Sequence, residues 1–403
     1  MIYGLVIITL SYIFSQFLVK SLFENVTKKD SIFINRLFYY HFFLSIVYYI
    51  YALSNPSDSI AYYNRTLTGS RGSSWGDYYG TSTPFIEWIG YPFIKYFGFS
   101  YEAIMALFAF FGFVGFIFFY KFFKERIYFN NKIFGYNLVT MFLLLPNLHF
   151  WSGSFGKGSL IFLGIALIFY ALNRIQTRWI LLIVGSLITY HIRPHIMFVI
   201  VVSSIVGFTF STKGLNWGLK LLMISISFTA FFFIYQDVLT IVGIEQGEEF
   251  TEGLNLTHRA TELSKATSGI DITSYSLPEQ LFTFLYRPLF FDAPGLLGII
   301  VSFENVFLLL VTIYFLYKGG IWYIIRSDFL VKTAFFSFIT VSIALAQISG
   351  NLGIAIRQKS QVMLLFLFVI VQFLDEKKLS QFRNKLVLKR KKESQLASIE
   401  RSK

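Results

Sequence analysis

LPNLHFWSGSFGKGSLIFLGIALIFYALNRIQTRWILLIVGSLITYHIRPHI, residues Leu145–Ile196, combines two apolar runs with a Gly/Ser-rich turn and a His-Ile-Arg-Pro-His turn. Its two apolar runs have the composition of membrane-crossing helices, although both are short, which is typical of helices that are broken or tilted within a bundle. The hairpin that they form places Lys157 on the same side of the membrane as His191, Arg193 and His195. Ionisable groups close to lipid are costly, so these four residues are functional candidates.

The composition of the whole chain agrees with a membrane protein. Of its 403 residues 55% are hydrophobic, 20% are aromatic and only 14% are charged, whereas a soluble domain has roughly a quarter charged residues. We therefore expect an all-α, polytopic transmembrane helical bundle. About eleven runs are candidate spans, namely Ile2–Phe23, Leu37–Leu53, Tyr101–Tyr120, Tyr136–Phe150, Gly158–Asn173, Trp179–Tyr190, Ile196–Phe210, Trp217–Tyr235, Gly295–Tyr317, Phe329–Ser349 and Gln361–Leu374.

The distribution of Lys and Arg predicts the domains and their orientation. Residues 377–403 carry ten Lys or Arg against two Glu and form a basic cytoplasmic tail, and residues 1–376 form the membrane domain. With this tail in the cytoplasm the other short basic loops also fall inside, which puts the N-terminus outside. The first apolar run lacks a basic leader and a cleavage site, so we interpret it as a span rather than a signal peptide. Two long outer loops remain, 54–100 and 236–294.

Several classes of chemistry are excluded at this stage. There is no cysteine, so disulfides and thiol catalysis are ruled out. The net charge of +13 comes mostly from the tail, which argues against a nucleic-acid partner. The run Gly153–Ser159 has the spacing Gly-x-x-Gly-Lys-Gly-Ser, which is not that of a phosphate loop, and no strand precedes it. Lys157 instead lies at the start of a helix, where an anion is favoured.

Basic residues from four outer turns are candidates for binding an anionic substrate. Arginine offers a bidentate fork for phosphate, and clustered cations in a helical bundle suit a diphosphate. The alternative is that each residue is an isolated interfacial anchor or a snorkelling side chain. The predicted substrate-binding set is Lys157, Arg193, Arg287, Arg357 and Lys359, with Trp151 stacking on a sugar ring.

Acidic residues and histidines in the same turns are candidates for proton transfer. Asp58 and Asp77 lie in the first outer loop, where either can activate a sugar hydroxyl or hold a divalent cation, or be a solvated carboxylate. His191 and His195 can act as bases or merely satisfy carbonyl groups. No spacing requires a metal site, and we expect no cofactor, with a divalent cation left as an open alternative. Glu304, inside an apolar span, is expected to have a structural partner.

Taken together, these motifs resemble those of the O-antigen and exopolysaccharide polymerases (Wzy-like and EpsG-like). The resemblance rests on stretches spread over most of the chain, which are Asp58-Ser-Ile-Ala-Tyr62, Gly112-Phe-Val-Gly115, Leu145–Lys157, His191–His195, Phe284–Pro288 and Ser302–Asn305. It implies a GT-C-like bundle in the bacterial inner membrane that joins polyprenyl-diphosphate-linked oligosaccharide repeats outside the cell, without a nucleotide. It also implies that outer arginines, here Arg193 and Arg287, hold the diphosphate. A flippase and chain-length or export proteins are the implied partners.

Three other functions fit parts of the sequence. A GT-C glycosyltransferase that moves one sugar from a polyprenyl-phosphate donor would use an acidic residue of the first outer loop, such as Asp58 or Asp77. A flippase or transporter would place its charges at mid-membrane, whereas here they concentrate outside, apart from Glu304. A non-catalytic assembly partner would tolerate the loss of Arg193 and Arg287.

Overall fold

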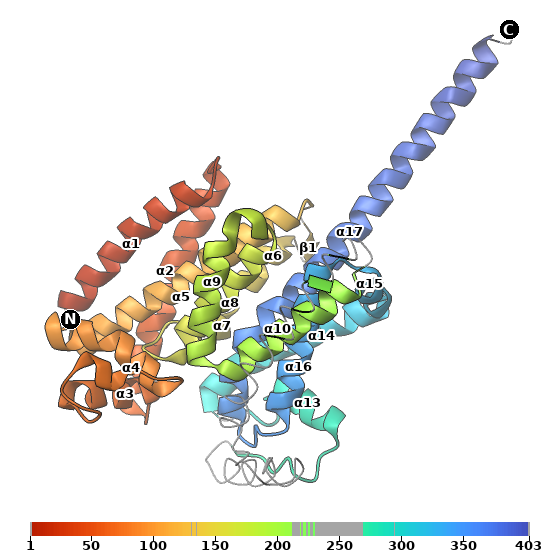
Figure 1. Ribbon diagram of the computed structural model, residues 1–403. Coiled ribbons are helices and arrows are strands. Elements are labelled where there is room, and N and C mark those ends of the chain that lie inside the picture. The colour runs from red at the N-terminus through yellow and green to blue at the C-terminus, as the bar shows by residue number, and fades with distance from the viewer. Residues whose placement is uncertain are drawn as a thin grey trace.

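A computed structural model describes residues 2–211, except 130 and 134, and residues 269–401, except 294, together with positions 218, 221, 222, 225 and 229. These residues are almost entirely helical, with one short antiparallel hairpin (Figure 1). In chain order the elements are α1 (Ile2–Leu22), α2 (Lys28–Ser54), α3 (Asp58–Thr68), η1 (Trp75–Tyr78), α4 (Thr83–Tyr91), η2 (Pro92–Tyr96), α5 (Tyr101–Arg126), β1 (Lys132–Ile133), β2 (Tyr136–Asn137), α6 (Leu138–Leu143), α7 (Pro146–Ser152), α8 (Lys157–Leu172), α9 (Ile175–Ile192), α10 (Pro194–Thr209), α13 (Leu277–Tyr286), α14 (Gly295–Tyr317), α15 (Gly320–Arg326), α16 (Phe329–Ala346) and α17 (Leu352–Arg401).

Seven of the described helices are long and apolar enough to cross a membrane, so the expectation of a multi-pass helical membrane protein is supported. These helices are α1, α2, α5, α9, α14, α16 and the first part of α17. Three shorter apolar segments, Leu138–Ser152, Lys157–Leu172 and Pro194–Thr209, correspond to further predicted spans. The predicted span Trp217–Tyr235 lies almost entirely outside the described residues. The predicted count of about eleven spans is therefore not confirmed by the described residues.

One predicted span is divided into several pieces. The run Tyr136–Phe150 begins in the β1–β2 hairpin and continues as α6, which ends at Leu143. A new helix, α7, begins at Pro146, where proline has no N–H to donate and suits a first turn. His149 and Trp151 therefore lie in the same short helix, α7.

The interior of the bundle is built around α5 and α8. Nearly every residue of α8 is buried, and α5 contributes a series of buried phenylalanines. Small residues allow α8 and α9 to approach closely, because a Cβ at Gly185 would lie 2.8 Å from the Gly164 carbonyl oxygen. Close backbone approach through glycine is a common way to pack helices where lipid surrounds them.

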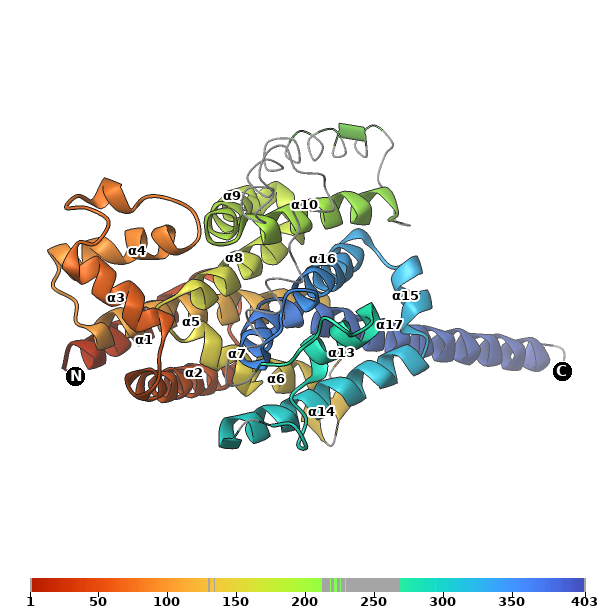
Figure 2. The same ribbon diagram turned by 90° about the horizontal axis from the view of Figure 1, so that it is seen from below.

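The two long outer loops of the prediction are partly helical. The 54–100 region contains α3, η1, α4 and η2, and Figure 2 shows α3 and α4 beside the ends of the membrane helices. Most of the 236–294 region lies outside the described residues. Its described part includes α13, which begins with the predicted cap, since Ser276 and Glu279 form a reciprocal capping box. We call this end of the molecule, at the bottom of Figure 1, the site end.

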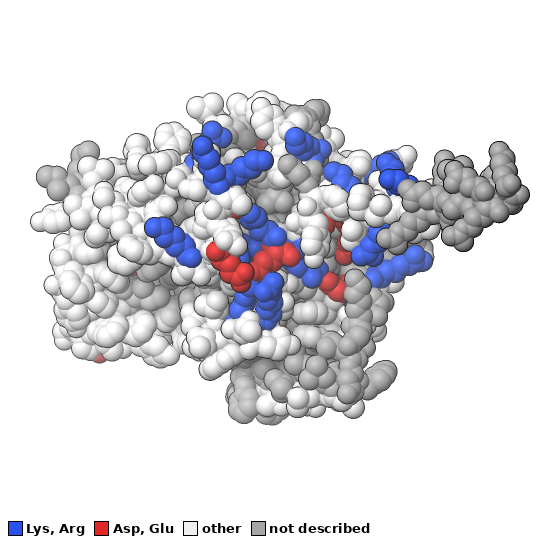
Figure 3. Space-filling view, turned by 90° about the horizontal axis from the view of Figure 1, so that it is seen from above, with Lys and Arg blue, Asp and Glu red and all other residues white. Residues whose placement is uncertain are grey.

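The opposite end of the bundle carries many of the basic side chains. Figure 3 shows Lys and Arg around a small acidic group near the base of the projecting helix α17. There Arg126 pairs with Asp328 at 2.5 Å, and Arg178 pairs with Glu125 at 2.7 Å. We call this the basic end. Helix α17 runs without a break through the predicted boundary between 376 and 377, so the basic tail continues the last membrane helix.

Candidate functional site

Asp58 and Arg357 form an ion pair at the site end, although they are 299 residues apart in the sequence. Asp58 is the first residue of α3, which Ser57 caps, and Arg357 lies in the second turn of α17. An Arg357 Nη1 donates to an Asp58 carboxylate oxygen at 2.5 Å. The guanidinium carbon also lies 5.7 Å from the centre of the Trp151 ring, within the range of a cation–π contact.

Lys157 is the first residue of α8 and faces the same region. Its Nζ donates to the Ser82 hydroxyl at 2.7 Å. The next residue, Gly158, passes so close to α7 that a Cβ there would lie 2.2 Å from the Trp151 carbonyl oxygen. Glycine at this position therefore keeps Trp151 and Lys157 side by side.

Arg193 occupies the junction between α9 and α10. Its backbone N–H donates to the Thr189 carbonyl at 2.8 Å and its carbonyl accepts from Ile196 at 3.0 Å, so one residue ends α9 and starts α10. The Nε atom is buried and has no hydrogen-bond partner among the described residues. Burial, and then the charge of Arg357, lowers the pKa of Arg193 to about 10, which still leaves it positive at neutral pH.

These groups form one electrostatic unit, which we call the cation cluster: Asp58, Lys157, Arg193 and Arg357. Lys157 interacts with the charges of the other three members. The cluster holds three positive side chains and one carboxylate, and Arg357 is paired with that carboxylate. This excess of positive charge favours an anionic ligand.

A small cavity lies between three members of the cluster, Asp58, Lys157 and Arg357. Its volume is about 10 Å³, which is the space of about one water molecule. A sugar or a diphosphate enters only if the side chains around it separate. It is lined by Tyr48, Asp58, Ser59, Trp151, Ser154, Phe155, Gly156, Lys157, Gly158 and Arg357.

An aromatic stack adjoins the cluster. Trp75 stacks on Trp88 at 4.9 Å, Trp88 on Phe85 at 5.6 Å, and Phe85 on His191 at 4.6 Å. The His191 carbonyl accepts from the backbone N–H of Ser82, the residue that holds Lys157. The aromatic surface and the cations therefore form one continuous wall.

Two hydrogen bonds engage both nitrogens of the His191 ring. In the neutral ring, Nδ1 donates to the Leu187 carbonyl at 2.8 Å and Nε2 accepts from the Tyr79 hydroxyl at 2.9 Å. The nitrogen that would act as a base is thus engaged by Tyr79. His195 is the second residue of α10 and is not among the residues that line the small cavity.

Asp77 lies on an exposed turn and is not among the residues that line the small cavity. Its carboxylate accepts from the Ser74 backbone N–H at 2.8 Å and closes a capping box around η1. These hydrogen bonds from Ser74 lower the pKa of Asp77. The contacts of Asp77 give it a role in shaping the loop.

Two of the predicted cationic residues are engaged elsewhere in the structure. Arg287 pairs with Asp292 at 2.5 Å, directly after α13. Lys359 is buried, and its Nζ donates to the Leu285 carbonyl at 2.9 Å and to the Asn305 side chain. Neither residue lines the small cavity. Of the predicted basic residues, Lys157 and Arg357 line it.

Glu304 has the structural partner that the sequence led us to expect. Its carboxylate accepts from the Asn147 backbone N–H at 3.0 Å and interacts electrostatically with Lys359. These groups join α7, α14 and α17 inside the bundle.

The structure also reveals a buried pair that sequence reasoning missed. His41 and His149 face each other with their Nδ1 atoms 3.0 Å apart, and the His41 Nε2 lies 2.9 Å from the Ala109 carbonyl. The pair connects α2, α5 and α7. His41 lies in the middle of an apolar run, and nothing in the sequence connects it with a residue more than a hundred positions away.

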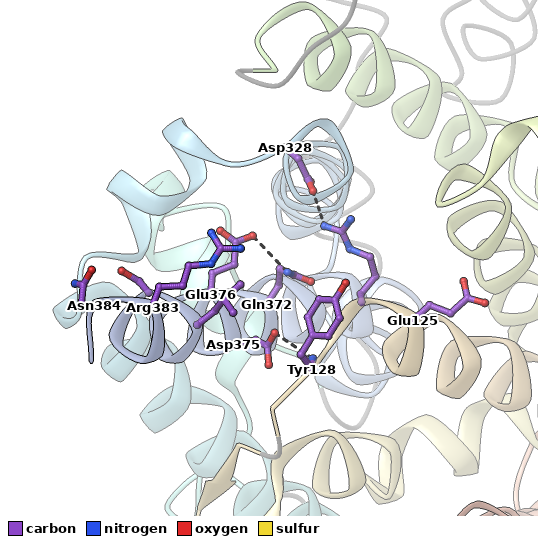
Figure 4. A pocket seen from close by; sticks show the side chains of 11 residues that line it. Glu125, Tyr128, Asp328, Gln372, Asp375, Glu376, Arg383 and Asn384 are labelled. Carbon is purple, nitrogen blue, oxygen red and sulfur yellow. Dashed lines mark hydrogen bonds and ion pairs between the residues drawn. The ribbon is translucent and has the colours of Figure 1, made fainter. Parts of the chain in front are cut away.

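A larger polar cavity lies at the basic end (Figure 4). Its volume is about 430 Å³. The Asp375 carboxylate accepts from the backbone N–H groups of Tyr128 and Phe129, at 3.1 and 2.6 Å, and Asp328 pairs with Arg126. These carboxylates therefore tie the end of α5 to α16 and α17.

Within the described ranges, no three His, Asp or Glu side chains are grouped so that they could hold a metal ion. Comparison with protein-family models, curated proteins and solved structures gave no match.

Proposed function

We propose that this protein is a polysaccharide polymerase that joins polyprenyl-diphosphate-linked oligosaccharide repeats at the outer face of a bacterial inner membrane. The observation that carries the proposal is the cation cluster, in which four distant segments of the chain bring three positive side chains and one carboxylate together. The segments are α3, the start of α8, the α9–α10 junction and α17. Such an excess of fixed positive charge at the end of a membrane bundle suits a lipid-linked diphosphate.

The chemistry requires charge stabilisation and one proton acceptor. The acceptor hydroxyl oxygen bonds to the anomeric carbon of the donor sugar, and the bond from that carbon to the diphosphate oxygen breaks. Lys157, Arg193 and Arg357 stabilise the charge that develops on the departing diphosphate. Asp58, the carboxylate of the cluster, takes the hydroxyl proton. The donor is already activated, so no nucleotide is consumed.

The aromatic stack supplies a surface for sugar rings. Trp75 is 39% exposed at the end of the stack, and Trp151 lines the small cavity. Indole faces are large apolar surfaces with a polar N–H at one edge, which suits the mixed character of a sugar ring. In this proposal the glycan lies along the wall that leads from Trp75 to Lys157.

A second candidate is a GT-C glycosyltransferase that moves one sugar from a polyprenyl-phosphate donor. The place of Asp58 in the first helix after α2 fits this reaction as well as the polymerase reaction, since either uses one carboxylate next to bound phosphate. The two candidates differ in product: the polymerase makes a ladder of repeats, and the transferase adds a single sugar.

The experiment is complementation of a gene deletion in the native host, followed by gel analysis of the surface glycans. Intact protein should restore a ladder of repeat units, and Arg193→Ala should restore only single repeats. Lys95→Gln is the matched control, because Lys95 is a basic residue of the same loop region and donates to the Leu67 carbonyl outside the cluster.

Each result has one interpretation. A ladder whose bands all shift by one sugar after deletion would favour the single-sugar transferase. A glycan profile that deletion leaves unchanged would contradict both enzymatic functions.

A further inference from the structure

In the structure, Asp58 and Arg357 form an ion pair with each other. The carboxylate oxygen that would accept a substrate proton receives a guanidinium N–H at 2.5 Å. The guanidinium that would hold a phosphate is turned toward the carboxylate. While the pair is intact, this carboxylate oxygen and this guanidinium N–H are engaged with each other.

The two partners differ in how firmly they are held. The Arg357 side chain is 24% exposed, rises from a long helix and lies over the Trp151 ring. The Asp58 side chain is 52% exposed and lies at the first position of α3. When the pair opens, Asp58 is therefore the partner that moves.

The positive charges beside Arg357 favour the replacement of Asp58, as the partner of Arg357, by a more highly charged anion. Lys157 and Arg193 add two positive charges beside Arg357, and Arg193 has a buried Nε without a partner among the described residues. A diphosphate carries more negative charge and more acceptor oxygens than one carboxylate, so it satisfies these cations better.

We infer that the Asp58–Arg357 ion pair is a latch that an incoming diphosphate opens. The diphosphate takes Arg357, the small cavity widens, and the released Asp58 turns to the acceptor hydroxyl. This inference rests on the proposed function for the identity of the ligand. Its consequence is an order of events, since the paired carboxylate oxygen of Asp58 is released only after the donor has bound.

The test is the affinity of the purified, detergent-solubilised protein for inorganic pyrophosphate, measured by calorimetry. Asp58→Asn should bind pyrophosphate about three- to fivefold more tightly than the wild type, because an ion pair of this exposure competes with about 1 kcal/mol or less. The same variant should fail to restore the glycan ladder. Arg357→Gln should bind at least about tenfold more weakly.

The matched control is Asp77→Asn, which removes the same charge from the same loop region outside the cluster. Its affinity for pyrophosphate should equal that of the wild type. Equal tightening in Asp77→Asn and Asp58→Asn would reduce the effect to general electrostatics and overturn the latch. Size-exclusion profiles confirm folding, and Asp58→Ala repeats the measurement if Asp58→Asn aggregates.

The remaining outcomes separate the latch from the proposed function. If the wild type binds pyrophosphate and Asp58→Asn binds it equally or more weakly, the latch is wrong and the diphosphate site stands. If the wild type, Asp58→Asn and Asp58→Ala all fail to bind pyrophosphate, the diphosphate site and the latch fail together.

Discussion

Gly158 determines how closely the candidate site is assembled. A methyl group there would lie 2.2 Å from the Trp151 carbonyl oxygen, a backbone atom that cannot move alone. Gly158→Ala should therefore displace Trp151 and Lys157 and reduce polymer formation by about tenfold or more, since misplacing binding groups by about 1 Å costs up to a hundredfold. The amount of polymer per unit of protein, read from the glycan gel, measures this effect.

Gly76→Ala is the control for that substitution. The nearest atom to its added methyl group is the Ser74 hydroxyl oxygen at 3.8 Å, an ordinary contact. Polymer formation should stay at the level of the wild type. Equal activity in both variants would show that the spacing between Trp151 and Lys157 does not matter for function.

At the scale of residues, the sequence predicted part of the cluster for good physical reasons. Lys157, Arg193 and Arg357 stand out because charges next to apolar runs are costly and therefore few. Their grouping with Asp58 depends on how α3 and α17 meet, and no local pattern encodes that contact. Lys359 is only two residues beyond Arg357, yet it is directed into the bundle. Basic residues two positions apart on a helix point in different directions. Their roles therefore cannot be assigned until the packing of the helix against its neighbours is known.

At the scale of elements, a buried polar group joins four helices, α7, α13, α14 and α17. Lys359 donates to Leu285 and Asn305, and Glu304 accepts from Asn147. Removing Lys359 leaves the buried Glu304 without a compensating charge. Lys359→Met should therefore lower the stability by roughly 3–5 kcal/mol, measured as a fall in the melting temperature of the detergent-solubilised protein.

The double variant Lys359→Met/Glu304→Gln tests whether the uncompensated charge of Glu304 causes this loss of stability. The neutral glutamine oxygen still accepts from Asn147, while the uncompensated buried charge is gone. We expect this variant to regain part of the lost melting temperature. A double variant that is less stable than Lys359→Met would contradict an electrostatic coupling between Lys359 and Glu304.

The contact between α8 and α9 depends on two glycines. A Cβ at Gly185 would lie 2.8 Å from the Gly164 carbonyl oxygen. Gly185→Ile should separate the helices and lower the melting temperature or the yield of folded protein. Ile183→Phe on the same helix is the control, since Ile183 is exposed and can face lipid. Similar behaviour of the two variants would argue against close packing of α8 and α9.

The sequence predicted most helices well and their ends less well. Long apolar runs identify α1, α5, α14 and α16, because few other structures bury so many apolar residues in lipid. The run Tyr136–Phe150 looks equally apolar, but Pro146 starts a separate helix within it. Composition alone does not distinguish one helix from two that meet at a proline.

At the scale of the whole molecule, the predicted orientation can be tested in the natural sequence background, because the chain has no cysteine. A cysteine placed at Ser70 of the site end should react with a membrane-impermeant maleimide in spheroplasts, which lack the outer barriers. One placed at Ser380 of the basic end should react only after the membrane is permeabilised. Both positions are exposed. The reverse labelling would place the basic end outside and contradict the proposed topology.

The sequence predicted the fold class of the protein but not how its helices are arranged in space. Composition establishes that the chain is a multi-pass helical protein, and Lys and Arg predict which loops share a side. The continuous helix α17 and the position of α3 and α4 beside the membrane helices depend on contacts between distant segments. Those contacts are side-chain packing, which a single sequence does not reveal.

Reconstitution tests the central claim most directly. The purified protein in proteoliposomes would be given polyprenyl-diphosphate-linked repeats from the host, with no nucleotide, and the products would be resolved by mass spectrometry. We predict a series of products separated by one repeat mass with the wild type, and unreacted single repeats with Arg193→Ala. No elongation by the wild type, or equal elongation by Arg193→Ala, would contradict a polymerase that acts through the cation cluster.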